Sequence, residues 1–400
     1  MPAYTALKDG FFPRLAAKTA LLDNLDRLKG EDARRALAAE RLGERDFLAL
    51  LSPAAEPFLE ETALRAREET LRHFGRAVQL FTPLYLANFC TNRCLYCGFN
   101  ARRSIERRLL LPEQVEEEAR AIAATGLRRI LALTGDAPAK TGAPYLASCV
   151  EVLARHFSSV GIEVPSMTVE EYARVAEAGA EGMTMFQETY NQTLYPFLHP
   201  AGPKRDFAFR LDAPQRAIMG GLRAVNLGAL LGLDDWRRDA FLTGLHAAFL
   251  QSRYPEEEIS VSLPRLRPCG EPPASREERE FTPRPVGDRH FVQILVALRC
   301  FLPHIGITLS TREPAGLRDK LIPLGVTRVS AGVSTAVGGH TAGQNQEKKD
   351  PQFEISDPRS VDEMAAAVTG LGYQPVFSDW LAAGAPETPL SAGIRAALGQ

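Results

Sequence analysis

Short apolar runs alternate with amphipathic stretches from about residue 82 onward, a pattern typical of βα units around a parallel sheet. Eight runs carry it, at residues 83–89, 128–134, 161–166, 182–187, 223–229, 258–264, 306–311 and 326–332. Eight parallel strands with helical crossovers can close on themselves. We therefore predict an α/β protein built as a (βα)8 TIM-type barrel, with an N-terminal helical extension and a short C-terminal extension.

Local signals between the runs support helices there. Thr168 and Glu171 have the spacing of a capping box, and Gly179 is placed to end the helix that they begin. Asp234 and Asp235 precede the amphipathic stretch WRRDAFLTGLHAAFL and are expected to begin a second helix.

Three segments are predicted. Residues 1–78 mix charged and apolar positions at helical spacing and are interpreted as a packing extension without chemistry of its own. Residues 79–380 form the barrel, and residues 381–400 a C-terminal tail.

Composition limits the partners of this chain. A formal net charge of -2 over 400 residues gives no overall field that would attract nucleic acid or an anionic membrane. No stretch reaches the roughly 18 uninterrupted apolar residues of a membrane span, and the N-terminus lacks the pattern of a secretory signal. We expect a cytoplasmic protein that binds neither membrane nor nucleic acid.

Polar residues gather at or just after the ends of the apolar runs, where barrel enzymes build their sites. After the first run comes a cysteine-rich loop. The positions after later runs are Thr134, Gly135, Asp136, Gln187, Glu188, Arg265, Arg267, Arg312 and Ser330.

The loop NFCTNRCLYCGFN carries the strongest chemical signal. Cys90, Cys94 and Cys97 follow a CxxxCxxC spacing and can bind three irons of a cubane [4Fe–4S] cluster, which leaves the fourth iron open to another ligand. Structural zinc is the alternative, but it needs a fourth Cys or His, and the loop contains none. The other cysteines, Cys149, Cys269 and Cys300, are isolated and are interpreted as packed or surface thiols.

This loop resembles the signature of the radical S-adenosylmethionine superfamily, in which the cofactor chelates the open iron. Tyr96, just before the last cysteine, matches the aromatic residue that touches adenine in that superfamily. The resemblance implies a 5′-deoxyadenosyl radical, which must be kept from water.

Longer segments are similar to the 2-iminoacetate synthase family of thiamine biosynthesis, over roughly residues 80 to 380. They are MFQETYNQTLYPFLHPAGPKRDFAFRLDAPQRA, NLGALLGLDDWR, SLPRLRP, LSTREPAGLRDKLIPLGVTRVSAG and QFEISDPRS. This resemblance implies cleavage of the Cα–Cβ bond of L-tyrosine to 2-iminoacetate and p-cresol, with 5′-deoxyadenosine and methionine as co-products. It also implies thiazole synthase as a partner and a reductant such as flavodoxin or ferredoxin.

The same resemblance assigns roles on each side of the site. On the cofactor side, Gly135 and Asp136 match the turn at the methionyl amino group, Glu188 an acidic residue that contacts the cofactor, and Arg210 the partner of its carboxylate. On the substrate side, Arg312 and Ser330 match residues that hold the amino-acid carboxylate, and Tyr85 faces the substrate. Two carboxylates in one cavity do call for two separate cationic groups.

Several alternatives stay open at this stage. Lys204 is either a cofactor contact or a solvated loop charge, while Arg265 and Arg267 either position the substrate or anchor the following proline-rich loop. A related lyase acting on L-tryptophan and a non-catalytic iron–sulfur protein are the competing functions. Tyrosine lyases of hydrogenase maturation carry a second cysteine-ligated cluster in a C-terminal domain, and this sequence has no cysteine after Cys300.

Overall fold

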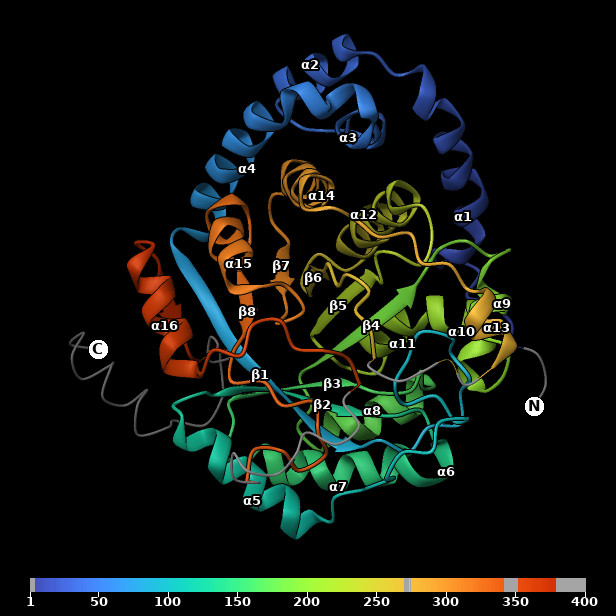
Figure 1. Ribbon diagram of the computed structural model, residues 1–400, viewed down its shortest axis with the longest axis vertical. Helices are drawn as coiled ribbons and strands as arrows, with labels where there is room; N and C mark the ends of the chain where they lie inside the picture. Colours follow the sequence, from blue (N-terminus) through green and yellow to red (C-terminus); the bar gives the residue numbers. More distant parts are fainter. Residues whose placement is uncertain (1–3, 270–272, 274, 342–351, 379–400) are drawn as a thin grey trace.

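The computed structural model describes residues 4–269, 273, 275–341 and 352–378. Its centre is a ring of parallel strands that follow one another in sequence order (Figure 1). β1 pairs in parallel with both β8 and β2, which closes the ring and confirms the predicted barrel. The strands are β1 (Ala77–Ala87), β2 (Arg129–Thr134), β3 (Ser159–Glu163), β4 (Gly182–Glu188), β5 (Ala224–Ala229), β6 (Glu258–Ser262), β7 (Gly306–Leu309), β8 (Arg328–Ser330) and β9 (Gln374–Val376).

Helices cover the outside of the ring and link successive strands (Figure 1). The crossover helices are α5 (Pro112–Ala124), α6 (Pro138–Thr141), α7 (Ala143–Leu153), α8 (Val169–Glu177), α9 (Tyr195–Leu198), α10 (Phe207–Leu211), α11 (Ala213–Met219), α12 (Trp236–Arg253), α13 (Arg276–Glu280), α14 (Asp288–Phe301), α15 (Ala315–Leu321) and, after β8, α16 (Val361–Gly370). Short 3-10 turns lie at Ala20–Arg27, Pro53–Phe58, Pro203–Arg205 and Ile322–Leu324. Every strand of the ring therefore has its inner face toward a shared interior and its outer face toward a helix.

The predicted helix signals are confirmed. The Thr168 hydroxyl accepts a hydrogen bond from the Glu171 backbone N–H at 3.2 Å, and α8 ends before Gly179, whose φ is +110°. Asp235 caps α12 by accepting from the Arg237 backbone N–H at 2.8 Å. These caps depend only on residues within three positions in the sequence.

The structure differs from the predicted strands in two places, the start of β1 and the additional strand β9. β1 begins at Ala77, six residues before the predicted run, because Gly75, with φ +61°, ends the preceding helix and the chain extends at once. β9 was not predicted at all. It pairs with residues 77–79 of β1, below the point where β2 begins its own pairing at Thr82.

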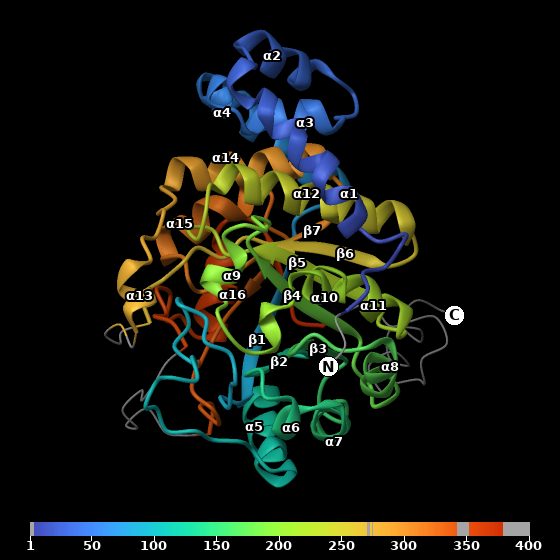
Figure 2. The same cartoon turned by 90° about the vertical axis from the view of Figure 1, so that its right-hand side faces the viewer.

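Four helices precede the barrel in the sequence. They are α1 (Phe12–Thr19), α2 (Gly30–Ala38), α3 (Glu44–Leu51) and α4 (Leu59–Phe74). α3 and α4 contact α14 on the outside of the barrel, and α2 to α4 lie together at one end of the molecule (Figure 2). The boundaries at residues 79 and 380 stay predictions, and the predicted tail, 381–400, lies outside the described residues.

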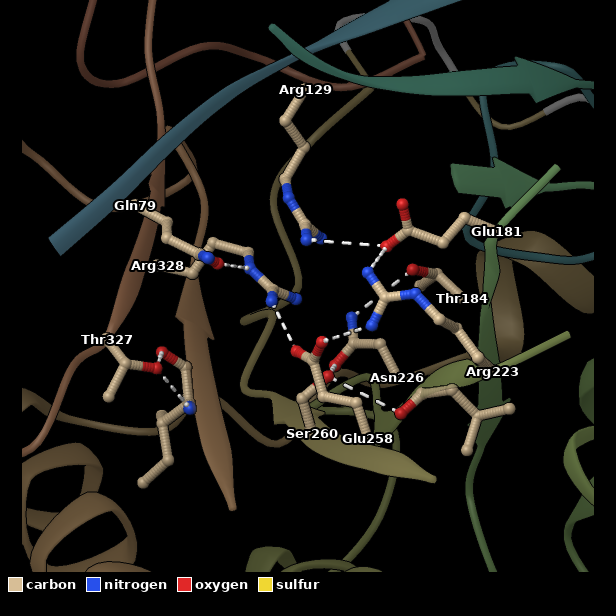
Figure 3. A network of polar contacts seen from close by, with 12 residues as sticks. Gln79, Arg129, Glu181, Thr184, Arg223, Asn226, Glu258, Ser260, Thr327 and Arg328 are labelled. Carbon is tan, nitrogen blue, oxygen red and sulfur yellow. Dashed lines mark hydrogen bonds and ion pairs between the residues drawn. The ribbon is translucent and has the colours of Figure 1, made fainter. Parts of the chain in front are cut away.

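A network of charged side chains crosses the N-terminal end of the barrel (Figure 3). Glu181 pairs with Arg129 at 3.6 Å and with Arg223, and Glu258 pairs with Arg328 at 2.6 Å and with Arg223 at 3.8 Å. These residues stand at or just before the starts of β2, β4, β5, β6 and β8. The network therefore joins strands across the ring at the end opposite the predicted site.

Within the part of the chain that the structure describes, no helix is both long and apolar enough to cross a membrane.

Candidate active site

A cavity of ≈ 190 Å³ occupies the inside of the barrel. It runs from the C-terminal ends of the strands down to Arg129 and Arg328 of the charged network. The predicted site residues that line it are Tyr85, Tyr96, Cys97, Glu188, Arg312 and Ser330. The remaining five do not line it: Cys90, Cys94, Gly135, Asp136 and Arg210.

The cysteine loop follows β1 and is held from two sides. On one side, the Gly135 backbone N–H donates to the carbonyl oxygen of Ala87 at 2.9 Å, which fixes the loop against the end of β2. On the other side, the Leu95 backbone N–H donates to the carbonyl oxygen of Leu198 at 3.2 Å. The loop is thus clamped between the segments that follow β2 and β4.

The three thiols of this loop fit a [4Fe–4S] cluster. Cys94 is buried, and Cys90 and Cys97 are half-buried. Burial raises the pKa of each thiol, that of Cys97 to about 11, and the Lys204 ammonium acts in the opposite direction. Thiols in such surroundings are deprotonated by binding a metal, and a cubane takes one thiolate per iron.

Within the described residues, no three His, Cys, Asp or Glu side chains converge closely enough to bind a single metal ion. Ligands of a cubane need not converge in this way, because each one binds a different iron.

Asn92 links the cysteine loop to two charged residues. Its Nδ2 donates to Asp136 Oδ2 at 2.7 Å, and its Oδ1 accepts from the Lys204 backbone N–H at 3.0 Å. Asp136 Oδ1 is buried and has no hydrogen-bond partner among the described residues. A buried acceptor without a partner is costly, so this oxygen is suited to an N–H of a bound molecule.

Glu188 lies at the end of β4 in a strained backbone conformation. Its φ is +72°, which no other described non-glycine residue has in the positive range. The carboxylate pairs with Lys204 Nζ and, at 3.5 Å, with an Arg210 guanidinium nitrogen. Strain of this kind gathers at functional sites. Lys204 is therefore a buried partner of Glu188, so its interpretation as a solvated loop charge was wrong.

Tyr96 is oriented by a residue that the sequence analysis left without a role. Its hydroxyl lies 2.8 Å from His199 Nε2, and His199 Nδ1 lies 2.9 Å from the carbonyl oxygen of Tyr195. Burial holds the pKa of His199 well below its usual value, so the ring is neutral. Nδ1–H then donates to Tyr195 and Nε2 accepts from Tyr96.

Tyr85, Arg312 and Ser330 all line the cavity. Arg312 is close enough to Tyr85 to lower its pKa, whereas Ser330 pairs with Phe81, four residues before Tyr85 in β1. The Arg312 guanidinium lies 3.6 Å from the centre of the Phe353 ring, and no described residue accepts a hydrogen bond from it. Ser330 Oγ is buried without a hydrogen-bond partner among the described residues. These groups are free to bind a carboxylate.

The segment around QFEISDPRS covers this part of the cavity. Its sequence is similar to the family, but no role was predicted for it. The Tyr85 hydroxyl donates to Gln352 Oε1 at 2.6 Å, and Phe353 supplies the ring beneath Arg312. The Ser356 backbone N–H donates to the carbonyl oxygen of Thr311 at 2.9 Å, which ties the segment to the loop after β7. Only the tertiary structure could reveal this arrangement.

Arg265 and Arg267 anchor the loop that carries Arg312. Arg265 Nε donates to both carboxylate oxygens of Glu313 at 2.9 Å, and Arg267 NH2 lies 3.1 Å from the same carboxylate. Arg267 Nε also donates to the carbonyl oxygen of Arg312 at 2.7 Å. Arg265 NH1 also donates to the carbonyl oxygen of Val286 at 2.8 Å, at the far end of the proline-rich loop, which supports anchoring of that loop by Arg265. Arg267 holds the loop after β7 instead and also lines the cavity, so neither of its two predicted roles is decided.

Glu163 was missed by sequence reasoning. It ends β3 and lines the cavity, and its carboxylate has no hydrogen bond or ion pair with any described residue. Burial and the charge of Glu188 raise its pKa to about 7, while the cations Arg312, Arg210 and Lys204 oppose the shift. Its only sequence signal was a charged residue inside the predicted apolar run 161–166.

Comparison with known families divides the chain into two parts. Residues 84–243 match the model of the radical SAM superfamily, and residues 262–374 match that of the biotin and thiamin synthesis associated domain.

Individual relatives cover more of the chain. It is 40% identical over 352 residues to 2-iminoacetate synthase of Escherichia coli K12, a match that covers 87% of this chain and 90% of that protein. It is 30% identical to 3-methylornithine synthase of Methanosarcina acetivorans over 44% of this chain and 50% of that protein. The X-ray structure of the FeFe-hydrogenase maturase HydG from Carboxydothermus hydrogenoformans is similar with a TM-score of 0.81 and 28% identity, covering 91% of this chain and 84% of that one.

Proposed function

Because this chain belongs to the 2-iminoacetate synthase family of radical S-adenosylmethionine enzymes, we propose that it cleaves the Cα–Cβ bond of L-tyrosine. The products are 2-iminoacetate and p-cresol, with 5′-deoxyadenosine and methionine as co-products, and the imine serves the thiazole of thiamine. The enzyme class itself, a radical S-adenosylmethionine carbon–carbon lyase, follows from the family.

The observation that carries this proposal is the pair of separate cationic groups around one cavity. Arg210 and Lys204 lie at Glu188, beside the cysteine loop, whereas Arg312 lies on the wall with Tyr85. S-adenosylmethionine and an amino acid each bring one carboxylate, and each needs its own cation. A site for a single ligand would not require both.

On the cofactor side, we assign Cys90, Cys94 and Cys97 as the three ligands of one [4Fe–4S] cluster. When S-adenosylmethionine is bound, Tyr96 would contact its adenine, Gly135 and Asp136 would bind its methionyl amino group, Arg210 would bind its carboxylate, and Glu188 would be a further contact. The partnerless oxygen of Asp136 supports its part in this assignment. When bound, cluster and cofactor supply a 5′-deoxyadenosyl radical that abstracts hydrogen from the substrate amine.

On the substrate side, the Arg312 guanidinium and the Ser330 hydroxyl hold the amino-acid carboxylate, and Tyr85 faces the substrate. The chain then acts by positioning: it keeps the amine N–H close to the 5′ carbon of the cofactor. The buried walls exclude water, which would otherwise quench a radical. Thiazole synthase is the proposed protein partner, and flavodoxin or ferredoxin the proposed reductant.

A product assay tests the proposal. The protein is reconstituted with iron and sulfide without oxygen, reduced, and mixed with S-adenosylmethionine and either L-tyrosine or L-tryptophan. We expect p-cresol and 5′-deoxyadenosine to accumulate together from tyrosine. No p-cresol, or faster turnover of tryptophan, would overturn the substrate assignment.

Two cysteine substitutions serve as the test variant and the control variant for this assay. Cys94→Ser should lose the cluster and the products, whereas Cys149→Ala, in α7 on the outside of the barrel, should keep both.

A further inference from the structure

Side chains along β3 alternate between the inside and the outside of the barrel, and this alternation places Glu163 on the inner face. Gly161 and Glu163 both line the cavity, whereas Val160 and Ile162 between and beside them are buried in the layer under the helices. The Glu163 carboxylate therefore faces open cavity.

The cavity contains two carboxylates among its described lining residues, and their surroundings differ. Glu188 is neutralised by Lys204 and Arg210. Glu163 has no ion pair or hydrogen bond with a described residue. A half-buried charge without a partner is costly, so Glu163 is suited to a cationic group brought by a ligand.

Glu163 lies between the two halves of the site. Burial, followed by the charge of Glu163, raises the pKa of Tyr85 on the substrate side, and Arg312 opposes that shift. The negative charge of Glu188, on the cofactor side, in turn helps to raise the pKa of Glu163. The charged and titratable groups around it are Tyr85 from β1, Glu188 from β4, Lys204 and Arg210 from the segment after β4, and Arg312 from the loop after β7.

We propose that Glu163 binds the α-ammonium group of the amino-acid substrate and accepts the proton that must leave this nitrogen before a hydrogen atom is abstracted from it. This inference rests on the proposed function. An α-amino acid is a zwitterion whose carboxylate and ammonium groups are attached to the same carbon, so a carboxylate held by Arg312 keeps the ammonium group within a few ångströms. That group then lies toward the cofactor half, where the N–H is needed.

The proton transfer is balanced without any further reagent. One N–H bond of the ammonium breaks, its electron pair stays on nitrogen, and a new O–H bond forms on the Glu163 carboxylate. The products are a neutral amine and a neutral carboxylic acid. The proton returns to water when the products leave.

A carboxyl pKa near 7 suits this step, because a base works best when its pKa lies near the working pH. The neutral amine retains two N–H bonds, one of which would be available to the radical that the bound cofactor supplies.

A binding experiment isolates the contact from the radical chemistry. The holoenzyme is titrated with L-tyrosine and with 3-(4-hydroxyphenyl)propanoate, which lacks the amino group. A charge-assisted contact is worth about 1.5–3 kcal/mol, so the wild type should prefer tyrosine by roughly 10- to 140-fold. Glu163→Gln should lose most of this preference, and Glu163→Asp should restore part of it.

The pH profile of p-cresol formation gives a second readout. In the wild type, kcat/KM for tyrosine should rise as the pH increases through about 7, because the carboxylate form is the active one. In Glu163→Gln this rise should disappear. Glu177→Gln, an exposed carboxylate at the end of α8, is the matched control and should behave as the wild type.

The outcomes separate the two proposals. If the wild type forms p-cresol and Glu163→Gln keeps both the preference and the pH profile, the role of Glu163 is wrong and the proposed function stands. If the wild type prefers tyrosine through Glu163 but forms no p-cresol, the proposed function is wrong and the ammonium site stands. Glu163→Asp keeps the charge, so it answers the question if the Gln variant does not fold.

Discussion

Gly135 shows how closely the cysteine loop and the end of β2 approach each other. A Cβ added at this position would lie 2.2 Å from the carbonyl oxygen of Phe89 and 3.2 Å from the Cβ of Cys90. Backbone atoms cannot move aside as a side chain can. The glycine is therefore required by a close approach next to a proposed cluster ligand, since its φ is not in the positive range.

We expect Gly135→Ala to displace the cysteine loop. Overpacking of this kind costs about 1–3 kcal/mol or more, and the strain falls on the residues beside Cys90. Iron and sulfide analysis after reconstitution should show a clear loss of cluster.

The control is Gly316→Ala, in α15, where no atom lies within 4 Å of an added Cβ. That change should leave the cluster intact and stabilise the fold by roughly 0.5–1 kcal/mol. Equal cluster contents in the two variants would contradict the argument.

Among the elements, α15 and the segment around residues 352–357 hold the end of β8 in place. Arg318 donates from NH1 to Asp357 Oδ2 at 2.5 Å and from NH2 to the carbonyl oxygen of Ser330 at 2.5 Å. Arg318 and Asp357 are at most 1% exposed. This buried pair fixes the backbone of Ser330 and carries the segment that brings Gln352 and Phe353 to the cavity.

Asp357→Asn should break this connection. It leaves the Arg318 charge buried with reduced compensation, and loss of one partner of a buried pair typically costs about 3–5 kcal/mol. We expect a lower thermal midpoint of the reconstituted protein and weaker binding of tyrosine.

Glu354→Gln changes an exposed carboxylate of the same segment and should shift the free energy of unfolding by less than about 0.5 kcal/mol. If the two variants unfold at the same temperature, the pair does not support the segment.

The whole molecule buries titratable groups that make its stability depend on pH. Burial raises the pKa of Asp239, in α12, to about 8, although the Tyr190 backbone N–H donates to it at 2.8 Å. A carboxyl whose pKa is raised on folding adds stability below its unfolded pKa, near 4, and this contribution is lost as the pH rises through about 8. Burial lowers the pKa of His246 to about 3, and well above pH 6.5 this ring is neutral in both states.

We therefore expect the thermal midpoint of the wild type to fall between about pH 6.5 and pH 8.5. Asp239→Asn should reduce this fall, because the amide still accepts from Tyr190 and does not titrate. Glu163 acts in the same direction, so part of the decline should remain. Calorimetry across this pH range checks the prediction, and a slope identical to that of the wild type would contradict it.

The barrel fold and the iron–sulfur site could both be predicted from the sequence, because the signals for them are local. Strand and helix periodicity follow from local geometry, and capping at Thr168 and Asp235 depends on neighbours within three residues. The CxxxCxxC spacing likewise indicates its cluster within eight residues. The remaining site residues were predicted from resemblance to the family.

Other features depend on residues far apart in the chain, and only the tertiary structure decided them. β9 forms because β1 offers an unpaired edge below β2, and Lys204 is an ion-pair partner because Glu188 lies next to it. Glu163 gains its importance from the cavity that it lines and from charges on three other segments. The sequence by itself determined the barrel and the cysteine loop, because those signals are local. Burial and long-range electrostatics determined which carboxylate is left without a partner, because both depend on the packed whole.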